Sequence, residues 1–316
     1  MNIIATDGFA LNPGDLNWDT IEPLGKLRIF DRTSVSEIEE RCIDADIILT
    51  NKVPFNRETL EKLPKLKCIC VLATGFDIID IKAAAEKGIM VCNVPDYSSS
   101  SVAQHTFAFI LELCTQVGLH SASVHKGDWA KCPDFSYSLS PLTELDGKTL
   151  GLVGFGNIGR KVAGIARAFG MEVLYHTPSQ KETELAEYTD LESLFRKSDI
   201  VSLHVPLRPE TKHFVNSALL STMKPTAFLI NTARGLLINE QDLADALNEG
   251  IIAGAGIDVL SVEPPDPDNP LLRAKNCFIT PHNAWMSKEA RLRIMDTTFR
   301  NITGFIAGSP VNVIKP

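Results

Sequence analysis

Three segments in the second half of the chain carry polar residues whose types suit carbonyl chemistry. They are Asn231-Thr232-Ala233-Arg234-Gly235, Asp258-Val259-Leu260-Ser261-Val262-Glu263-Pro264 and Thr280-Pro281-His282-Asn283-Ala284-Trp285. Arg234 offers a planar fork for a carboxylate or carbonyl oxygen, His282 can donate a proton to a forming alkoxide, and Glu263 can orient the imidazole. Each residue alone is more often structural. Because each segment follows a predicted strand, where parallel sheets bind ligands, the three together indicate carbonyl reduction.

A glycine-rich segment, Gly154-Phe155-Gly156-Asn157-Ile158-Gly159, follows the predicted strand Thr149–Val153 and opens a predicted helix ending near Phe169. In this context the first glycine permits a tight turn, and the second allows a pyrophosphate to approach the backbone. The third glycine lets the helix pack on the strand. Free N–H groups at the helix N-terminus then face the anion. The segment predicts a dinucleotide site, and a glycine-rich turn without a ligand is the alternative.

The choice between NADH and NADPH depends on the end of the next predicted strand, Val173–His176. An acidic residue there would bind the ribose diol and repel a 2′-phosphate. Thr177 stands at this place instead and repels nothing, while Lys181 is within reach of a phosphate. We therefore expect relaxed cofactor choice, with an incidental surface turn as the alternative.

Short apolar runs alternate with helical patterns along the chain, as in βαβ units with a parallel sheet. The first series has strands Ile3–Thr6, Leu27–Phe30, Ile47–Thr50, Cys68–Ala73 and Ile89–Cys92, and helices Glu37–Ile43, Glu58–Leu63 and Ile81–Lys87. The second has strands Leu150–Val153, Val173–His176, Ile200–Val205, Ala227–Asn231, Ala253–Val259 and Phe278–Thr280, and helices Asn157–Phe169, Leu191–Lys197, Asn216–Thr222 and Gln241–Asn248. A helix over Ser287–Ala307 closes the chain. The two series predict two similar sheets joined by helices.

One long helical pattern, Ser98–Leu119, lies between the two series and opens on serines able to cap a helix. The pattern is apolar on nearly all sides, so we expect the helix to be buried on more than one of them. Either both domains or a second subunit would provide that cover.

The composition is that of an ordinary globular protein. The 316 residues favour two domains, and 44% of them are hydrophobic and 22% charged. A net charge of -8 disfavours a nucleic-acid or anionic-membrane partner. The seven cysteines mostly lie in apolar runs, which predicts reduced buried thiols, and Cys68 and Cys70 have no second pair at metal-ligand spacing. With no signal peptide and no long apolar run, we expect a cytoplasmic protein with no membrane contact and no metal.

Further motifs carry a family resemblance: Ala73-Thr74-Gly75-Phe76-Asp77, Ser101-Val102-Ala103-Gln104-His105 and Pro133-Asp134-Phe135-Ser136-Tyr137. Together with the glycine-rich segment and the three strand-end segments, they appear in a specific order. The chain resembles the D-isomer-specific 2-hydroxyacid dehydrogenase family over essentially its full length. Within that family it most resembles the glycerate dehydrogenase (hydroxypyruvate reductase) branch.

The resemblance implies roles for particular residues. Arg234, Glu263 and His282 match the catalytic triplet, and the backbone of Thr74 and Gly75 matches the loop that, with Arg234 and His282, binds substrate. Asp258 matches a residue near the nicotinamide carboxamide, and Val102 one beneath the nicotinamide. The remaining implied cofactor contacts are Gly154, Phe155, Gly156, Asn157, Ile158, Gly159, His176, Thr177, His204, Val205, Pro206, Thr211, Thr232, Ala233, Arg234 and His282.

The resemblance also implies an α/β architecture of two Rossmann-like, doubly wound parallel-sheet domains. Residues 1–97 plus 286–316 would form a flavodoxin-like substrate domain, and residues 98–285 an inserted NAD(P)-binding domain. A homodimer is implied, with the helix from Ser98 and the Trp129 loop at its interface. Because the chain stops at Pro316, we expect no appended regulatory domain of the kind found in long phosphoglycerate dehydrogenases.

The predicted function is hydride transfer between NAD(H) or NADP(H) and a small 2-oxo acid such as hydroxypyruvate or glyoxylate, with His282 as general acid and base. One alternative is another D-2-hydroxyacid dehydrogenase, acting on phosphoglycerate or D-lactate. A second alternative is a non-catalytic dinucleotide-sensing scaffold on the same fold. The residues leave the physiological substrate open, because one methylene changes binding by only about 1–3 kcal/mol.

Overall fold

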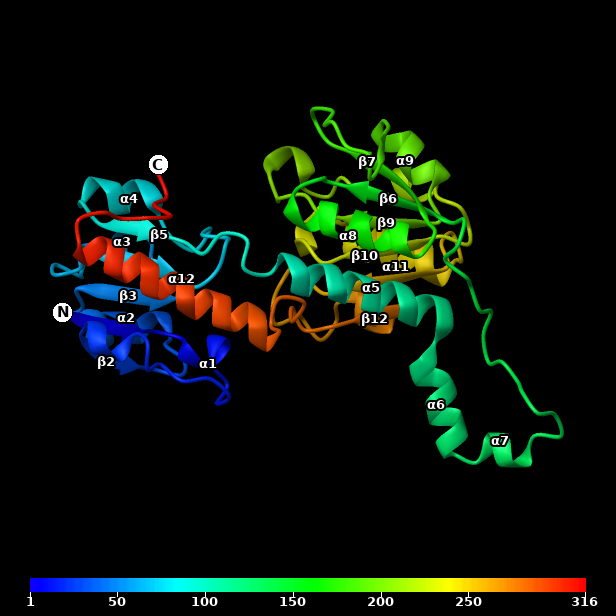
Figure 1. The fold of residues 1–316 in the computed structure, drawn as a ribbon, viewed down its shortest axis with the longest axis horizontal. Helices are drawn as coiled ribbons and strands as arrows, with labels where there is room; N and C mark the ends of the chain where they lie inside the picture. The colour runs from blue at the N-terminus through cyan, green and yellow to red at the C-terminus, as the bar shows by residue number, and fades with distance from the viewer. The chain divides into compact units, whose positions relative to one another are not determined.

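A computed structural model describes residues 1–316, which fold into two compact units (Figure 1). The first unit consists of Met1–Ser98 and Met286–Pro316, and the second of Ser99–Trp285. The second unit is thus inserted in the sequence of the first.

The first unit is built on a five-stranded parallel sheet with the strand order β2-β1-β3-β4-β5. Its strands are β1 (Asn2–Ala5), β2 (Lys26–Ile29), β3 (Ile47–Thr50), β4 (Cys68–Val71) and β5 (Met90–Cys92). Its helices are α1 (Gly8–Leu11), α2 (Ile38–Cys42), α3 (Arg57–Glu61), α4 (Ile81–Glu86) and α12 (Lys288–Ile306). Every residue of β3 and β4 is buried, which explains why these strands are apolar without alternation. The order 2-1-3-4-5 is that of flavodoxin-like sheets.

The second unit holds a seven-stranded parallel sheet with the order β12-β11-β10-β9-β6-β7-β8. Its strands are β6 (Thr149–Val153), β7 (Glu172–His176), β8 (Glu187–Tyr188), β9 (Ile200–Leu203), β10 (Phe228–Asn231), β11 (Gly254–Ile257) and β12 (Cys277–Ile279). Its helices are α5 (Ser99–Thr115), α6 (Val117–His125), α7 (Asp128–Lys131), α8 (Asn157–Ala168), α9 (Leu191–Lys197), α10 (Ser217–Leu220) and α11 (Glu240–Asn248).

The strand order reverses between β6 and β9, which is the switch point of a doubly wound sheet. The predicted fold class, two parallel-sheet α/β domains, is confirmed. Strand β8 was not predicted, because Glu187–Tyr188 pairs through only two residues and has no apolar run.

The helix predicted over Ser98–Leu119 is wrong in its extent. Gln116 takes a left-handed backbone conformation, with φ 45°, and ends α5 before α6 begins at Val117. Helix α5 packs on α8, β10 and β11 of its own unit, which accounts for much of its apolar surface. None of the helices on its own has the length and apolar composition of a membrane span. Taken together, α5 and α6 have that length and composition, but they are bent by 57° where they meet.

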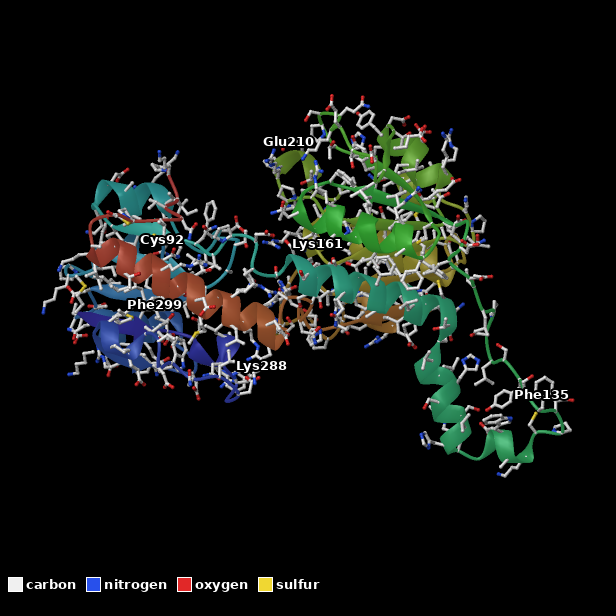
Figure 2. All side chains as sticks on the ribbon, viewed as in Figure 1. Cys92, Phe135, Lys161, Glu210, Lys288 and Phe299 are labelled. Carbon is white, nitrogen blue, oxygen red and sulfur yellow. The ribbon has the colours of Figure 1, made fainter.

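Part of the second unit projects from its sheet, and we call this part the arm (Figure 1). It consists of α6, α7 and the segment 132–148. Phe135 lies near its outer end (Figure 2) and is 90% exposed. Other large apolar side chains exposed along it are Val117, Leu119, Val124, Trp129, Leu139 and Leu142. The arm therefore presents an apolar surface that its own unit does not cover.

All seven cysteines are free thiols, and five of them are buried. In the first unit the Sγ atoms of Cys68 and Cys70 lie 4.0 Å apart, and Cys70 pairs with Cys92 on the neighbouring strand. Burial raises the pKa of the Cys42 thiol to about 11. Burial likewise raises the pKa of Cys277 to about 12, so these thiols stay protonated at neutral pH.

Candidate active site

His282 and Glu263 form a hydrogen-bonded pair at the carboxyl edge of the seven-stranded sheet. The Nδ1 atom of His282 lies 2.6 Å from Oε2 of Glu263. Oε1 of Glu263 accepts a 3.1 Å bond from the Leu260 N–H, so the carboxylate itself is anchored. Because Nδ1 faces a carboxylate, it carries a proton, and the ring orientation is fixed. The pair is the arrangement expected of an oriented acid–base histidine.

The backbone of His282 is held in an unusual conformation, with φ 51°. Its N–H donates to the carbonyl oxygens of Asp258 and Thr280, at 2.8 and 2.9 Å. A non-glycine residue in this left-handed region is uncommon and persists only where its surroundings impose it. The histidine therefore sits in a turn that depends on neighbouring loops.

Arg234 follows β10 in a turn organised by a buried asparagine. Asn231 accepts from the Ala233 N–H at 3.0 Å and donates to the Arg234 carbonyl at 2.9 Å. The guanidinium of Arg234 is exposed, and its Nη1 donates to the Ala233 carbonyl at 2.8 Å. A Cβ on Gly235 would collide with the backbone of Leu260, so this turn packs directly on the segment that leads to Glu263.

The order of the strands brings the three segments to one edge. Strands β10, β11 and β12 are neighbours in the sheet and run parallel, so Arg234, Glu263 and His282 follow the same ends of adjacent strands. The structure pairs Glu263 with His282 directly, whereas the guanidinium of Arg234 is bonded to its own turn.

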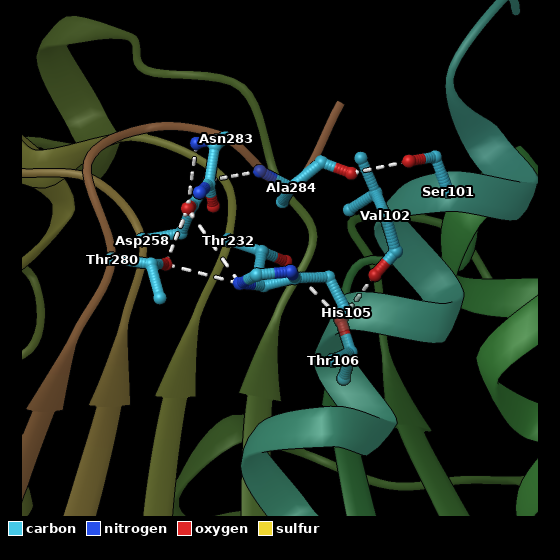
Figure 3. Close-up of polar contacts among 9 residues, drawn as sticks. All are labelled: Ser101, Val102, His105, Thr106, Thr232, Asp258, Thr280, Asn283 and Ala284. Atoms are coloured by element: carbon cyan, nitrogen blue, oxygen red, sulfur yellow. Dashed lines mark hydrogen bonds and ion pairs between the residues drawn. The ribbon is translucent and has the colours of Figure 1, made fainter. Parts of the chain in front are cut away.

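Asp258 fixes the loop that carries His282 (Figure 3). Its side chain is buried, and its carboxylate accepts from Thr280 Oγ1 at 2.6 Å, from the Asn283 N–H at 2.9 Å and from the Ala284 N–H at 3.1 Å. These bonds compensate the burial of the carboxylate. The expected contact of Asp258 with a nicotinamide carboxamide stays a prediction.

Three residues of α5, namely Ser101, His105 and Thr106, join this network (Figure 3). The motif Ser101–His105 carried the family resemblance, but no role was predicted for any of these three side chains. Ser101 Oγ donates to the Ala284 carbonyl at 2.6 Å, and His105 Nε2 lies 3.0 Å from Thr280 Oγ1. Thr106 Oγ1 lies 3.3 Å from Thr232 Oγ1.

The glycine-rich segment has the geometry of a phosphate cradle. Gly154 has φ 102°, and a Cβ there would collide with the His204 carbonyl. A Cβ on Gly159 would collide with the Gly154 carbonyl, so this glycine permits close helix–strand contact. A Cβ on Gly156, in contrast, would point into open space, and α8 begins there without a side-chain cap. The N–H groups of Asn157 and Ile158 at the start of α8 thus fit a pyrophosphate.

The other expected cofactor residues lie along the same edge. Val102 is buried near the start of α5, and the His176 Nδ1 atom lies 3.0 Å from the Thr189 carbonyl. Thr211 Oγ1 donates to the Pro206 carbonyl at 2.9 Å and so closes the turn His204–Pro206. His204 Nε2 lies 3.0 Å from Ser202 Oγ, and burial lowers the pKa of its imidazole to about 4. His204 is therefore neutral at physiological pH.

Comparison with known proteins shows the family of the chain. The sequence profile of the family described as "D-isomer specific 2-hydroxyacid dehydrogenase, NAD binding domain" matches residues 107–284. The chain is 48% identical to the hydroxypyruvate reductase of Blautia hydrogenotrophica over 322 residues, which cover 100% of each chain. It belongs to the D-isomer-specific 2-hydroxyacid dehydrogenase family.

Two further members of the comparison bear on activity and cofactor. The glycerate dehydrogenase of Methylorubrum extorquens is 41% identical over 281 residues, which cover 88% of each chain. The structure of an acyclic imino acid reductase in complex with NADPH and D-Arg has a TM-score of 0.87 and 34% identity, with 100% of each chain covered. The predicted activity class is thus confirmed: the chain is an NAD(P)-dependent oxidoreductase of the D-2-hydroxyacid dehydrogenase family.

The loop after β7 is the segment predicted to decide between NADH and NADPH. Thr177 is buried and donates from Oγ1 to the Ser179 carbonyl at 2.7 Å. The Tyr175 hydroxyl accepts from the Lys181 N–H at 2.8 Å and donates to the Lys181 carbonyl at 2.6 Å. Lys181 Nζ donates to the Phe155 carbonyl at 3.3 Å, so its ammonium lies against the glycine-rich segment.

The predicted substrate loop belongs to the first unit of the dehydrogenase. Thr74 follows β4 and donates from Oγ1 to the Val94 carbonyl at 2.8 Å. Asn93 Nδ2 donates to the Thr74 carbonyl at 2.8 Å, so two residues after β5 hold this loop, which includes Gly75. No group of three or more His, Cys, Asp or Glu side chains is arranged to hold a metal ion.

Proposed function

We propose that this dehydrogenase reduces hydroxypyruvate to D-glycerate, and glyoxylate to glycolate, with His282 as the general acid. The 2.6 Å bond between His282 and Glu263 is the observation that carries the proposal. A histidine so oriented can supply the proton that carbonyl reduction requires, and it can remove that proton in the reverse direction. The names of the two relatives, hydroxypyruvate reductase and glycerate dehydrogenase, support hydroxypyruvate and glycerate as the substrate pair.

The residues of the chain divide the work as follows. Nδ1 of His282 is bonded to Glu263, so the proton delivered to the substrate oxygen is the one on Nε2. Arg234 holds the substrate's carboxylate and polarises its carbonyl, and the backbone of Thr74 and Gly75 binds the carboxylate. A dinucleotide held by the glycine-rich segment would supply the hydride from its nicotinamide. General acid–base help of this kind contributes about 10²–10⁴ in rate.

We further propose that the enzyme accepts NADPH as well as NADH. Thr177 stands where an acidic residue would repel a 2′-phosphate, and the ammonium of Lys181 is placed against Phe155 of the cradle. A neutral residue and a nearby cation suit a 2′-phosphate as well as a free diol. In this proposal residues 98–285 hold the cofactor and residues 1–97 plus 286–316 the substrate.

We also propose a cytoplasmic homodimer assembled through the helix from Ser98 and the Trp129 loop. The exposed apolar side chains of the arm support an interface, since exposed apolar patches often mark sites of protein–protein contact. The seven free thiols support a reducing compartment. Light scattering of the full chain tests the assembly: a monomeric mass at micromolar concentration would contradict it.

The decisive experiment is a panel of 2-oxo acids assayed with each reduced cofactor, with chiral analysis of the product. We expect brisk turnover of hydroxypyruvate and glyoxylate with both cofactors and a D-configured glycerate. A preference for NADH above about 10³ in kcat/KM would contradict the proposed cofactor choice. No turnover across the panel would instead favour a dinucleotide-sensing protein.

A further inference from the structure

One face of α5 reaches two loops of the candidate active site. Ser101 and His105, one helical turn apart, bond to the two ends of the 280–284 segment, at Ala284 and Thr280 (Figure 3). The adjacent Thr106 contacts Thr232, in the turn that carries Arg234. None of these α5 residues belongs to the catalytic triplet.

The direction of each hydrogen bond follows from counting protons. Thr280 has a single hydroxyl proton, and it gives this proton to Oδ1 of Asp258 at 2.6 Å. The 3.0 Å contact between Thr280 Oγ1 and His105 Nε2 must therefore have the histidine as donor. The result is a one-way chain of donors from His105 through Thr280 to the carboxylate of Asp258. Nε2 of His105 also lies 3.7 Å from Oδ1 of that carboxylate.

The chain of donors ends on the group that shapes the catalytic turn. Asp258 accepts the N–H groups of Asn283 and Ala284 with its carboxylate and the N–H of His282 with its backbone carbonyl. These bonds impose the left-handed conformation of His282, with φ 51°. A rotation of the Asp258 carboxylate would release both N–H groups and let the turn relax.

We propose that His105 is a positioning residue for the reduction: by donating from Nε2 to Thr280, it locks the carboxylate of Asp258 and thereby aims His282. The proposal rests on the proposed role of His282. It assigns a function to a residue of α5 that contacts neither the triplet nor the glycine-rich cradle in any bond described above. Positioning matters because a displacement of about 1 Å at a reacting group can lower the rate roughly 100-fold.

A packing role is the competing explanation, because the His105 ring meets the Phe109 ring edge-to-face at 4.9 Å. Two substitutions separate the roles. His105→Phe keeps an aromatic ring against Phe109 but removes the donor, whereas His105→Gln removes the ring and keeps an N–H donor on a side chain of similar reach.

The test is steady-state reduction of hydroxypyruvate, with the dissociation constant of NADH measured by fluorescence. We expect His105→Phe to lower kcat about 10- to 100-fold. The KM and the NADH dissociation constant should stay within about threefold, because the hydrogen bonds from His105 through Thr280 to Asp258 orient His282 and do not bind substrate or NADH. His105→Gln should recover kcat to within about threefold of the wild type. A wild-type kcat for His105→Phe, or an equal loss in both variants, would overturn the proposal.

A second pair of variants, at Thr280, tests the proposal even if the His105 variants fold poorly. Thr280→Val breaks the chain of donors without changing the side-chain volume much, and Thr280→Ser preserves the hydroxyl. The valine variant should lose kcat as His105→Phe does, and the serine variant should not. Equal kcat values for the two would overturn the proposal.

His282→Ala, assayed in parallel, separates the two ideas. If this variant keeps its activity, the proposed function of His282 is wrong, whatever His105 does. If it is inactive while His105→Phe and Thr280→Val turn over normally, only the positioning role of His105 is wrong.

Discussion

The carboxyl edge of the seven-stranded sheet has two halves that are built in opposite ways. Beyond β10, β11 and β12, the loops are held by side chains, above all by the carboxylate of Asp258 and its donors. Beyond β6, the turn is defined by missing side chains, because Gly154 and Gly159 leave no room for a Cβ. The catalytic half therefore depends on particular functional groups, whereas the phosphate half depends on positions that carry no side chain. Substitutions should affect chemistry in the first half and cofactor affinity in the second.

The largest effect is expected from removing the proton donor. His282→Ala should lower kcat by about 10²–10⁴ while the dissociation constant of NADH changes far less than kcat, because the pyrophosphate cradle is untouched. Stopped-flow reduction of hydroxypyruvate and a cofactor titration measure the two quantities. A variant that lost NADH affinity as strongly as kcat would show that the two halves are not separate.

The reverse result is expected from filling the cradle. Gly156→Val should weaken NADH binding by more than about 100-fold, because the added side chain occupies the space that the pyrophosphate needs. The free energy of unfolding should change by no more than about 0.5 kcal/mol, since Gly156 has an ordinary extended backbone and an open neighbourhood.

Gly154→Ala is the matched control. With φ 102° and the His204 carbonyl in the way, it should destabilise the fold by more than about 1 kcal/mol. Chemical denaturation compares the two variants. If Gly156→Val proved as unstable as Gly154→Ala, the weaker binding would report misfolding rather than a blocked site.

His204, which follows β9 and whose backbone packs against Gly154 of the phosphate half, should make stability depend on pH. Burial lowers its pKa in the folded protein to about 4, whereas the unfolded value stays near 6.5. Between these values only the unfolded chain binds the proton, so stability falls as the pH is lowered from 6.5 towards 4, by about 2–3 kcal/mol in all. In His204→Asn this contribution is absent. Urea unfolding at pH 7.5 and pH 4.5 measures it, and an unchanged pH dependence in the variant would refute the assignment.

The smallest effect is expected at Lys181. Lys181→Ala should raise the dissociation constant of NADPH about three- to tenfold and leave that of NADH nearly unchanged, because exposed charge pairs contribute little. Lys197→Ala, which removes another exposed lysine at the end of α9, is the control. Equal weakening of both cofactors by Lys181→Ala would show that the ammonium supports the Phe155 segment rather than a 2′-phosphate.

The sequence predicted the parts of the molecule in which residue type and local pattern decide the outcome. Both parallel sheets followed from apolar runs between helical patterns, and the pairing of Glu263 with His282 followed from their chemistry and strand-end position. The left-handed Gln116 was missed because glutamine is a good helix former, and the nearby Gly118 falls at the start of α6 rather than at the break. The contact of His105 with Thr280 was missed because the partners are 175 residues apart in the chain. Such bonds depend on the packing of α5 over the sheet, which no local pattern encodes.

The thiols clustered in the first unit have a consequence for the irreversible inactivation of the enzyme during storage. Cys68, Cys70 and Cys92 lie in the sheet with no solvent-exposed surface, which protects their thiols from oxidants while the strands stay paired. Opening of the sheet brings several sulfhydryls into water at once and close together in the chain, where they can cross-link and prevent refolding. Storage life in air should thus follow the unfolding rate, and a reducing agent should protect the heated enzyme far more than the cold one.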